Sequence, residues 1–116
     1  MTDERVYKMS LATVYLLLVN KATRKGRSQA EVDQVICWLT GYEPVKLQQQ
    51  LTLGVDYETF FQEAPQLNPN AAQITGSVCG IKVQEIRDPL LQKIRWLDKL
   101  IDELAQGSPL EKIFGS

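Results

Sequence analysis

Histidine is absent from this chain of 116 residues, and cysteine occurs only twice, at Cys37 and Cys79. Without an imidazole, the sequence excludes the usual general base, most zinc sites and every catalytic triad built on histidine. The two cysteines lie far apart and nothing indicates secretion, so both are expected to be reduced thiols. The sequence therefore indicates no cofactor and no metal.

Long hydrophobic runs are absent as well. The stretch LATVYLLLV at 11–19 is too short to span a bilayer, and no other run comes closer. The opening MTDERVYKMS is too polar and acidic for a signal peptide. We therefore expect a cytoplasmic protein that has no contact with a membrane.

The composition is that of an ordinary globular protein, with 44% hydrophobic and 23% charged residues. A chain of this length can bury one core without disulfides or metal. Because most segments carry helix signals, we predict a mainly α fold, a compact single domain of five to six short helices over 1–116. Residues 1–8 are expected to form a loose N-terminal segment.

The first helix is predicted from a cap at Ser10 to about Lys25, with Gly26 as its stop. It is apolar nearly all round, since Leu16 and Leu17 lie off its main apolar face. A helix of this kind is expected at the centre of the fold.

The second helix is the most clearly marked element of the chain. Ser28 and Glu31 have the spacing of a capping box, and Gly41 follows the last apolar position. Between them, a buried face is predicted at Val32, Val35, Ile36 and Leu39.

Turn signals divide the middle of the chain into shorter pieces. Pro44 fits the first position of a third helix that stops at Gly54, and Asp56 can cap a fourth, YETFFQEA. Asn68 and Pro69 form another cap and first-position pair. Residues 74–86 are compatible with helix or strand, and a short helix followed by an extended piece around 78–86 is favoured.

The longest helix is predicted from Asp88 to about Ala105, before a last half-turn at 108–114. A core seam with alternating spacings of three and four runs through Leu90, Ile94, Leu97, Ile101 and Leu104. A second apolar surface on the same helix is predicted at Leu91, Trp96 and Leu100. Because one surface suffices for the core, the second is predicted to hold a homodimer together.

Charge is unevenly distributed, although the net charge is only −1. Four cations, Lys21, Arg24, Lys25 and Arg27, surround Gly26 just before the second helix. They are candidate anion-binding residues, because a helix N-terminus attracts anions. The alternative is a solvated hinge in which Lys21 and Lys25 balance the dipole of the first helix. Both interpretations stay open.

Other titratable groups give no catalytic pattern. Asp98 and Asp102 share one helix face at i, i+4, a spacing more typical of a salt-linked, solvated face than of a metal site. Cys79, beside Gly80, is more often a buried thiol than a reactive one. No nucleophile lies beside a base, so no catalytic residue is nominated and an enzyme is disfavoured.

Several short segments together carry a resemblance, among them YKMS at 7–10, WLTGY at 38–42 and DPLLQKIRWLDKLIDELAQG at 88–107. With these, the chain resembles a bacterial family of small proteins known as domain of unknown function 2200. The resemblance runs from about Val6 to Ile113. It implies a bacterial, stand-alone domain and brings no catalytic residues with it.

Taken together, the patterns favour a non-enzymatic, self-associating interaction module, with any other protein partner unknown. The alternative is a weak, sequence-independent nucleic-acid or anion-binding domain that uses the basic segment at 21–27.

Overall fold

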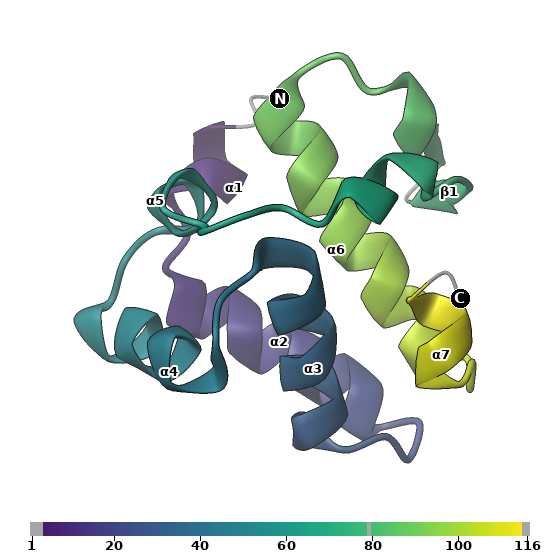
Figure 1. Ribbon diagram of the computed structural model, residues 1–116, viewed down its shortest axis with the longest axis horizontal. Helices are drawn as coiled ribbons and strands as arrows, with labels where there is room; N and C mark the ends of the chain where they lie inside the picture. Colours follow the sequence, from purple (N-terminus) through teal and green to yellow (C-terminus); the bar gives the residue numbers. More distant parts are fainter. Residues whose placement is uncertain (1–3, 79, 115–116) are drawn as a thin grey trace.

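Seven α-helices follow one another along residues 4–78 and 80–114, the parts of the chain that the computed structural model describes (Figure 1). Their bounds are Glu4–Lys8 (α1), Leu11–Thr23 (α2), Gln29–Thr40 (α3), Pro44–Leu53 (α4), Tyr57–Gln62 (α5), Pro89–Ala105 (α6) and Leu110–Ile113 (α7). The predicted mainly α fold is thereby confirmed, with one or two helices more than expected.

Residues between α5 and α6 form short elements instead of a long helix. They are the 3₁₀-helix η1 (Pro69–Gln73), the strands β1 (Ser77–Val78) and β2 (Ile81–Lys82), and the 3₁₀-helix η2 (Val83–Glu85). The two strands pair antiparallel, Ser77 opposite Lys82. Within 74–86 the sequence favoured a short helix followed by an extended piece, whereas the structure has the two strands first and the short helix η2 after them. The extended piece is thus present, but its order and its hairpin pairing were not predicted.

Helix α3 begins and ends as predicted. Ser28 Oγ accepts a hydrogen bond from the Glu31 N–H at 3.2 Å, and the Glu31 carboxylate accepts one from the Ser28 N–H at 2.9 Å. This reciprocal pair is the capping box. Gly41 ends the helix in the left-handed conformation, with φ of 81°. Both ends of α3 are therefore set by local sequence.

Residues 4–8 form helix α1, so the expectation of a loose segment over 1–8 was wrong for them. Val6 and Tyr7 pack against the core, and the Tyr7 hydroxyl donates a hydrogen bond to Asp88 Oδ2 at 2.5 Å. These contacts join the N-terminal segment to residues far along the chain. The sequence around residues 4–8 does not indicate these contacts, because their partners lie far along the chain.

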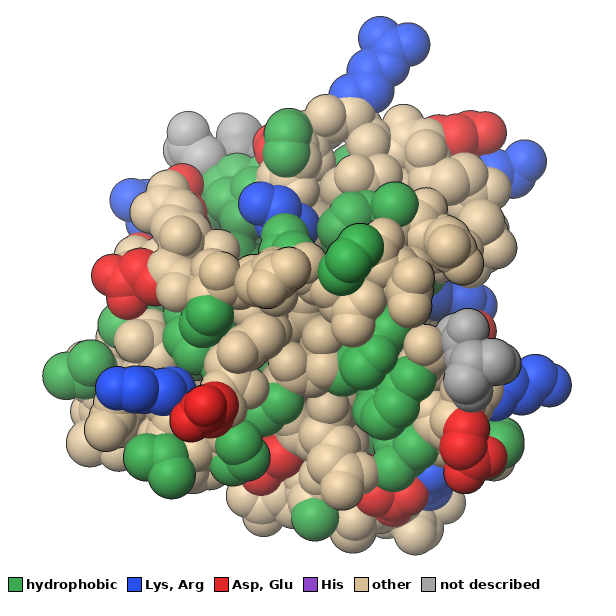
Figure 2. All heavy atoms as spheres, viewed as in Figure 1, with side chains coloured by type: hydrophobic (Ala, Val, Ile, Leu, Met, Phe, Trp, Pro, Cys, Tyr) green, Lys and Arg blue, Asp and Glu red, His purple; other side chains and the backbone are tan. Residues whose placement is uncertain are grey.

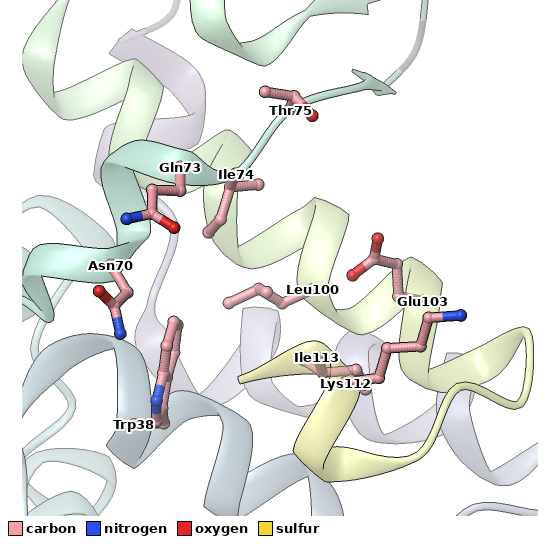
Figure 3. A pocket seen from close by; sticks show the side chains of 9 residues that line it. All are labelled: Trp38, Asn70, Gln73, Ile74, Thr75, Leu100, Glu103, Lys112 and Ile113. Carbon is pink, nitrogen blue, oxygen red and sulfur yellow. The ribbon is translucent and has the colours of Figure 1, made fainter. Parts of the chain in front are cut away.

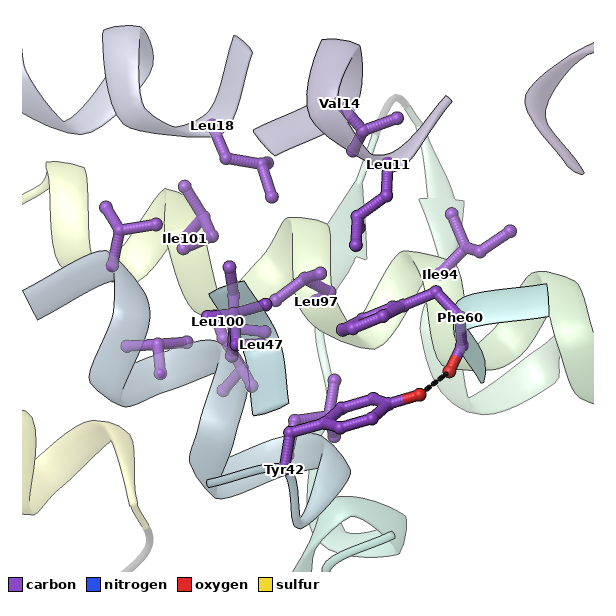
Figure 4. Close-up of a cluster of buried hydrophobic side chains, with 14 of the residues drawn as sticks. Leu11, Val14, Leu18, Tyr42, Leu47, Phe60, Ile94, Leu97, Leu100 and Ile101 are labelled. Carbon is purple, nitrogen blue, oxygen red and sulfur yellow. Dashed lines mark hydrogen bonds between the residues drawn. The ribbon is translucent and has the colours of Figure 1, made fainter. Parts of the chain in front are cut away.

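Helix α6 lies in the middle of the packing, in contact with α2, α3, α5 and α7 (Figure 1). In Figure 4 the α6 side chains Leu97, Leu100 and Ile101 lie between the labelled leucines and valine of α2 and Leu47 of α4, all within one hydrophobic cluster. The core contribution of α6 consists of Ile94, Leu97, Leu100, Ile101 and Leu104. Because other elements cover α6 on several sides, its buried face is wider than the predicted core seam and includes Leu100.

Helix α2 contacts four other helices, but it is not buried on all sides as its composition predicted. It packs through Leu11, Val14 and Leu18, whereas Leu16 and Leu17 point away from that face and are 58% and 56% exposed. Helices α3, α4, α5 and α6 all contact α2, yet none of them covers these two leucines. One side of an apolar helix therefore reaches the surface.

Two buried tyrosines differ in whether their hydroxyls form a hydrogen bond. This difference predicts that removing each hydroxyl has opposite effects on the free energy of unfolding. The Tyr42 hydroxyl donates to Phe60 O at 2.7 Å, whereas the Tyr57 hydroxyl is buried without a partner among the described residues. Tyr42→Phe should lower the free energy of unfolding by about 1 to 2 kcal/mol, because it leaves a buried carbonyl unpaired. Tyr57→Phe should raise that free energy by about 1 kcal/mol. Urea unfolding followed by circular dichroism measures both, and equal losses in the two variants would contradict the structure.

Candidate functional site

The exposed large hydrophobic side chains of the described residues gather on two helices. The five side chains and their exposed fractions are Leu16 58%, Leu17 56%, Val45 65%, Leu53 72% and Ile81 46%. Four of these five belong to α2 and α4, which pack against one another. Figure 2 shows hydrophobic side chains reaching the surface at the lower left, where α4 lies in Figure 1. We call Leu16, Leu17, Val45 and Leu53 the α2–α4 surface.

The α2 part of this surface follows from helical periodicity. With 3.6 residues per turn, the buried positions Leu11, Val14 and Leu18 define one side of the helix, and Leu16 and Leu17 fall on the other. No charged residue occurs between Leu11 and Asn20. The outer side of α2 therefore lacks the charges that normally mark a solvent-facing helix.

The α4 part is a shallow hollow of about 500 Å³. It is lined by Val45, Gln48, Gln49, Thr52 and Leu53, none of which carries a charge. Helix α4 buries Leu47 on its opposite side. A glutamine amide carries both donor and acceptor groups, so the polar part of this lining can pair with another amide.

The predicted self-association residues on α6 do not form a comparable surface. Leu100 is only 1% exposed and belongs to the core, so its placement on a docking surface was wrong. Trp96 is half-buried against the core, and Leu91 is half-buried as well. The sequence feature that indicates the α2–α4 surface is the stretch at 11–19, which is uncharged and apolar nearly all round the helix. Leu16 and Leu17 of this stretch lie at the surface and not at the centre of the fold.

The four cations of the basic segment do not converge on one point. Lys21 forms an ion pair with Asp102, and Arg27 forms one with Glu31 at 2.7 Å. Arg24 lies at the exposed end of α2, and Lys25 follows it in the turn. The N-terminus of α3 is already occupied by its capping box. Anion binding by these residues therefore stays a prediction, and the geometry adds nothing in its favour.

Arg27 has a structural role that the sequence did not reveal. Its Nη1 donates hydrogen bonds to Leu104 O at 3.2 Å and to Ser108 O at 2.9 Å. These carbonyls lie at the C-terminal end of α6, where a cation is favourable. The acceptors are far from Arg27 in sequence, so no local pattern could identify them. Arg27 thus joins the start of α3 to the end of α6.

The Arg27–Glu31 pair makes stability depend on pH in a defined direction. Hydrogen bonds from Arg27, then from the backbone of Ser28, lower the pKa of Glu31 from 4.5 to about 2. Because the folded pKa lies below the unfolded one, the stabilisation is present above about 4.5 and is lost as the pH falls toward 2. Glu31→Gln, which can still cap the helix, should cost about 1 kcal/mol at neutral pH. Urea unfolding over a pH series should show this difference vanish in acid; a difference independent of pH would contradict it.

Neither a cluster of metal ligands nor an activated thiol is found among the described residues. Residues 4–78 and 80–114 contain no group of three or more His, Cys, Asp or Glu that could hold a metal ion. Burial and the nearby Asp33 carboxylate raise the pKa of Cys37, which keeps this half-buried thiol protonated. Cys79 lies outside the described residues. Within the described ranges, no helix is long and apolar enough to cross a membrane.

The fold and its apolar surface define a small, mainly helical domain. The chain belongs to the family DUF2200, described as an uncharacterized protein conserved in bacteria, whose model matches residues 5–115. A solved structure, that of uncharacterized protein SP1917, is similar with 44% identity and a TM-score of 0.91. The match covers 97% of this chain and 92% of that one. No curated protein matches the chain. The family resemblance drawn from the sequence segments is thus confirmed.

Proposed function

We propose that the protein is a non-enzymatic interaction module that associates with a second copy of itself through the α2–α4 surface. The observation that carries this proposal is the position of the exposed apolar side chains. Four of the five large ones among the described residues lie on two helices in contact. Exposed apolar side chains gathered on neighbouring helices typically mark an interaction site.

A second copy suits this surface because the surface carries no charge that would repel the same surface of another copy. In a two-fold dimer the same patch of both copies meets, so a patch of one charge sign would face its own charge. The stretch from Leu11 to Asn20 carries no charge, and neither do the residues that line the hollow on α4. The Gln48 and Gln49 amides can each donate to and accept from amides of the second copy. Apolar contact then needs no compensating charge from a different protein.

The extent of the surface suits a modest rather than a tight dimer. Helix α2 has 13 residues and α4 has 10, which correspond to lengths of about 20 and 15 Å. A standard interface takes about 800 Å² from each partner, against a total surface of 6674 Å² for this chain. With a helix diameter of about 10 Å, the outer sides of two helices of this length fall short of that area, so the interface is a weak one. We expect a micromolar dissociation constant.

Charge reversal on the surface tests the proposal. Leu17→Glu and Val45→Glu place a carboxylate on α2 and α4, respectively, where each would lose its water on contact with the uncharged surface of the second copy. Both residues are exposed, so the fold should keep its stability within about 0.5 kcal/mol. The matched control is Ile81→Glu, an exposed apolar residue on β2, outside the α2–α4 surface. Sedimentation equilibrium over a micromolar concentration series measures the association.

The expected result is a concentration-dependent dimer for the wild type and for Ile81→Glu, with monomers for the other two variants. A wild type that stays monomeric throughout would show that a second copy is not the occupant. A dimer that survives both Leu17→Glu and Val45→Glu would place the interface elsewhere.

A further inference from the structure

A second feature of the molecule is a hollow on another part of its surface. It has a volume of about 200 Å³ and lies between η1, α6 and α7 (Figure 3). Its floor is apolar and fixed, because Leu100 and Ile113 are both buried in the core. Trp38 and Ile74 form apolar walls. None of these residues belongs to the α2–α4 surface.

Polar side chains from separate elements surround this floor. Asn70 and Gln73 come from η1, Thr75 follows it, Glu103 comes from α6 and Lys112 from α7. Neither Glu103 nor Lys112 forms an ion pair with another described residue. The hollow thus offers one carboxylate and one ammonium group, each free to meet a charge on a ligand.

The walls are held in place by contacts outside the hollow. The Asn68 N–H donates to Leu39 O at 2.9 Å, which ties the start of η1 to α3. The Asn68 side chain accepts from the Asn70 N–H at 2.9 Å. On the other side, the ring of Phe114 stacks on that of Trp38, with centroids 5.3 Å apart. The hollow is therefore formed by positioned elements and does not require a rearrangement.

The arrangement of the charges selects a ligand class. Figure 3 shows Glu103 and Lys112 on one side of the hollow, with Trp38 and Asn70 on the opposite side and Leu100 between them. Because Glu103 and Lys112 lie on the same side of the hollow, a ligand that meets both must carry its ammonium and its carboxylate at one end, with its remainder over the apolar floor. An α-amino acid with an apolar side chain has this form, since both charged groups are attached to one carbon.

We infer that the hollow binds a small apolar α-amino acid, with its ammonium at Glu103, its carboxylate at Lys112 and its side chain over Leu100 toward Trp38. The volume lies below the range of about 300 to 1,000 Å³ that is usual for drug-sized ligands, which limits the ligand to a molecule about as small as a single amino acid. A small ligand on an open rim binds weakly, with a dissociation constant on the order of 1 mM. The inference is independent of the proposed dimer.

The test is a titration of the ¹⁵N-labelled protein with L-leucine, followed by backbone amide chemical shifts. The amides of Asn70, Thr75, Glu103 and Ile113 should shift together and saturate. N-acetyl-L-leucine lacks the ammonium and L-leucinamide lacks the carboxylate. Each should therefore bind about fivefold more weakly, the change in affinity that corresponds to losing one exposed ion pair.

Two variants assign the charges and one serves as a control. Glu103→Gln should weaken L-leucine binding about fivefold and abolish the preference over N-acetyl-L-leucine, and Lys112→Gln should do the same with respect to L-leucinamide. Lys46→Gln, at an exposed lysine of α4 outside the hollow, should leave binding unchanged. The absence of shifts with L-leucine, shifts confined to other regions, or equal binding by all three variants would overturn the inference.

Discussion

Replacing Gly41 with alanine should lower the free energy of unfolding by about 3 to 5 kcal/mol, a large part of the total for a chain of this size. Gly41 has a φ of 81°, in the left-handed region that an alanine enters only at a cost. An added Cβ would also lie 2.5 Å from Gln66 O and 2.9 Å from Gln66 N. The backbone at Gln66 would have to move, because a main-chain atom cannot rotate away as a side chain can.

That movement would break further contacts. The Gln66 N–H donates to Thr40 O at 3.3 Å, and the neighbouring Asn68 N–H donates to Leu39 O at 2.9 Å. Both bonds hold the segment after α5 against the end of α3. The cost of Gly41→Ala therefore combines backbone strain with lost hydrogen bonds between distant segments.

Gly54→Ala is the matched control for this prediction. Gly54 also has a positive φ, of 72°, but nothing lies within 4 Å of an added Cβ there. Its replacement should cost only about 1 kcal/mol, the backbone strain alone. Urea unfolding of both variants gives the comparison. Similar losses at Gly41 and Gly54 would show that the contact with Gln66 is unimportant.

An aspartate at Leu100 should unfold the domain. Leu100 is 1% exposed in the centre of α6, and a buried charge without a partner costs several kcal/mol, comparable with the whole stability of such a domain. The sequence led to the opposite expectation, that a charge at Leu100 would separate a dimer and leave folded monomers. Leu17→Asp is the control, because Leu17 is 56% exposed on α2. Circular dichroism melting curves should show a cooperative transition for Leu17→Asp and none for Leu100→Asp; a folded Leu100→Asp protein would contradict the packing.

The helical segments could be predicted because their ends are marked by local chemistry. Ser28 and Glu31 lie three residues apart and satisfy each other's backbone groups, so the start of α3 is readable without any distant contact. The same applies to Asp88, whose carboxylate accepts from the Leu90 N–H at 3.0 Å at the start of α6. Such signals need only a few neighbouring residues.

What could not be predicted depends on contacts between distant segments. The periodicity of α6 gives its apolar positions but not how many other helices cover it, so Leu100 was placed on the outside. The apolar pattern of α2 predicts burial on all sides, and only the positions of the other helices show that Leu16 and Leu17 lack a cover. Arg27 was read as a free cation because its acceptor Leu104 O lies 77 positions along the chain.

The central claim, that the α2–α4 surface meets the same surface of a second copy, is tested most directly by isotope-filtered nuclear Overhauser spectroscopy. A mixture of ¹³C-labelled and unlabelled protein reports only contacts between copies. We expect intermolecular contacts among the methyl groups of Leu16, Leu17, Val45 and Leu53, and their disappearance in Leu17→Glu. No intermolecular contact at concentrations where the wild type sediments as a dimer, or contacts confined to Leu91 and Trp96 of α6, would contradict the account.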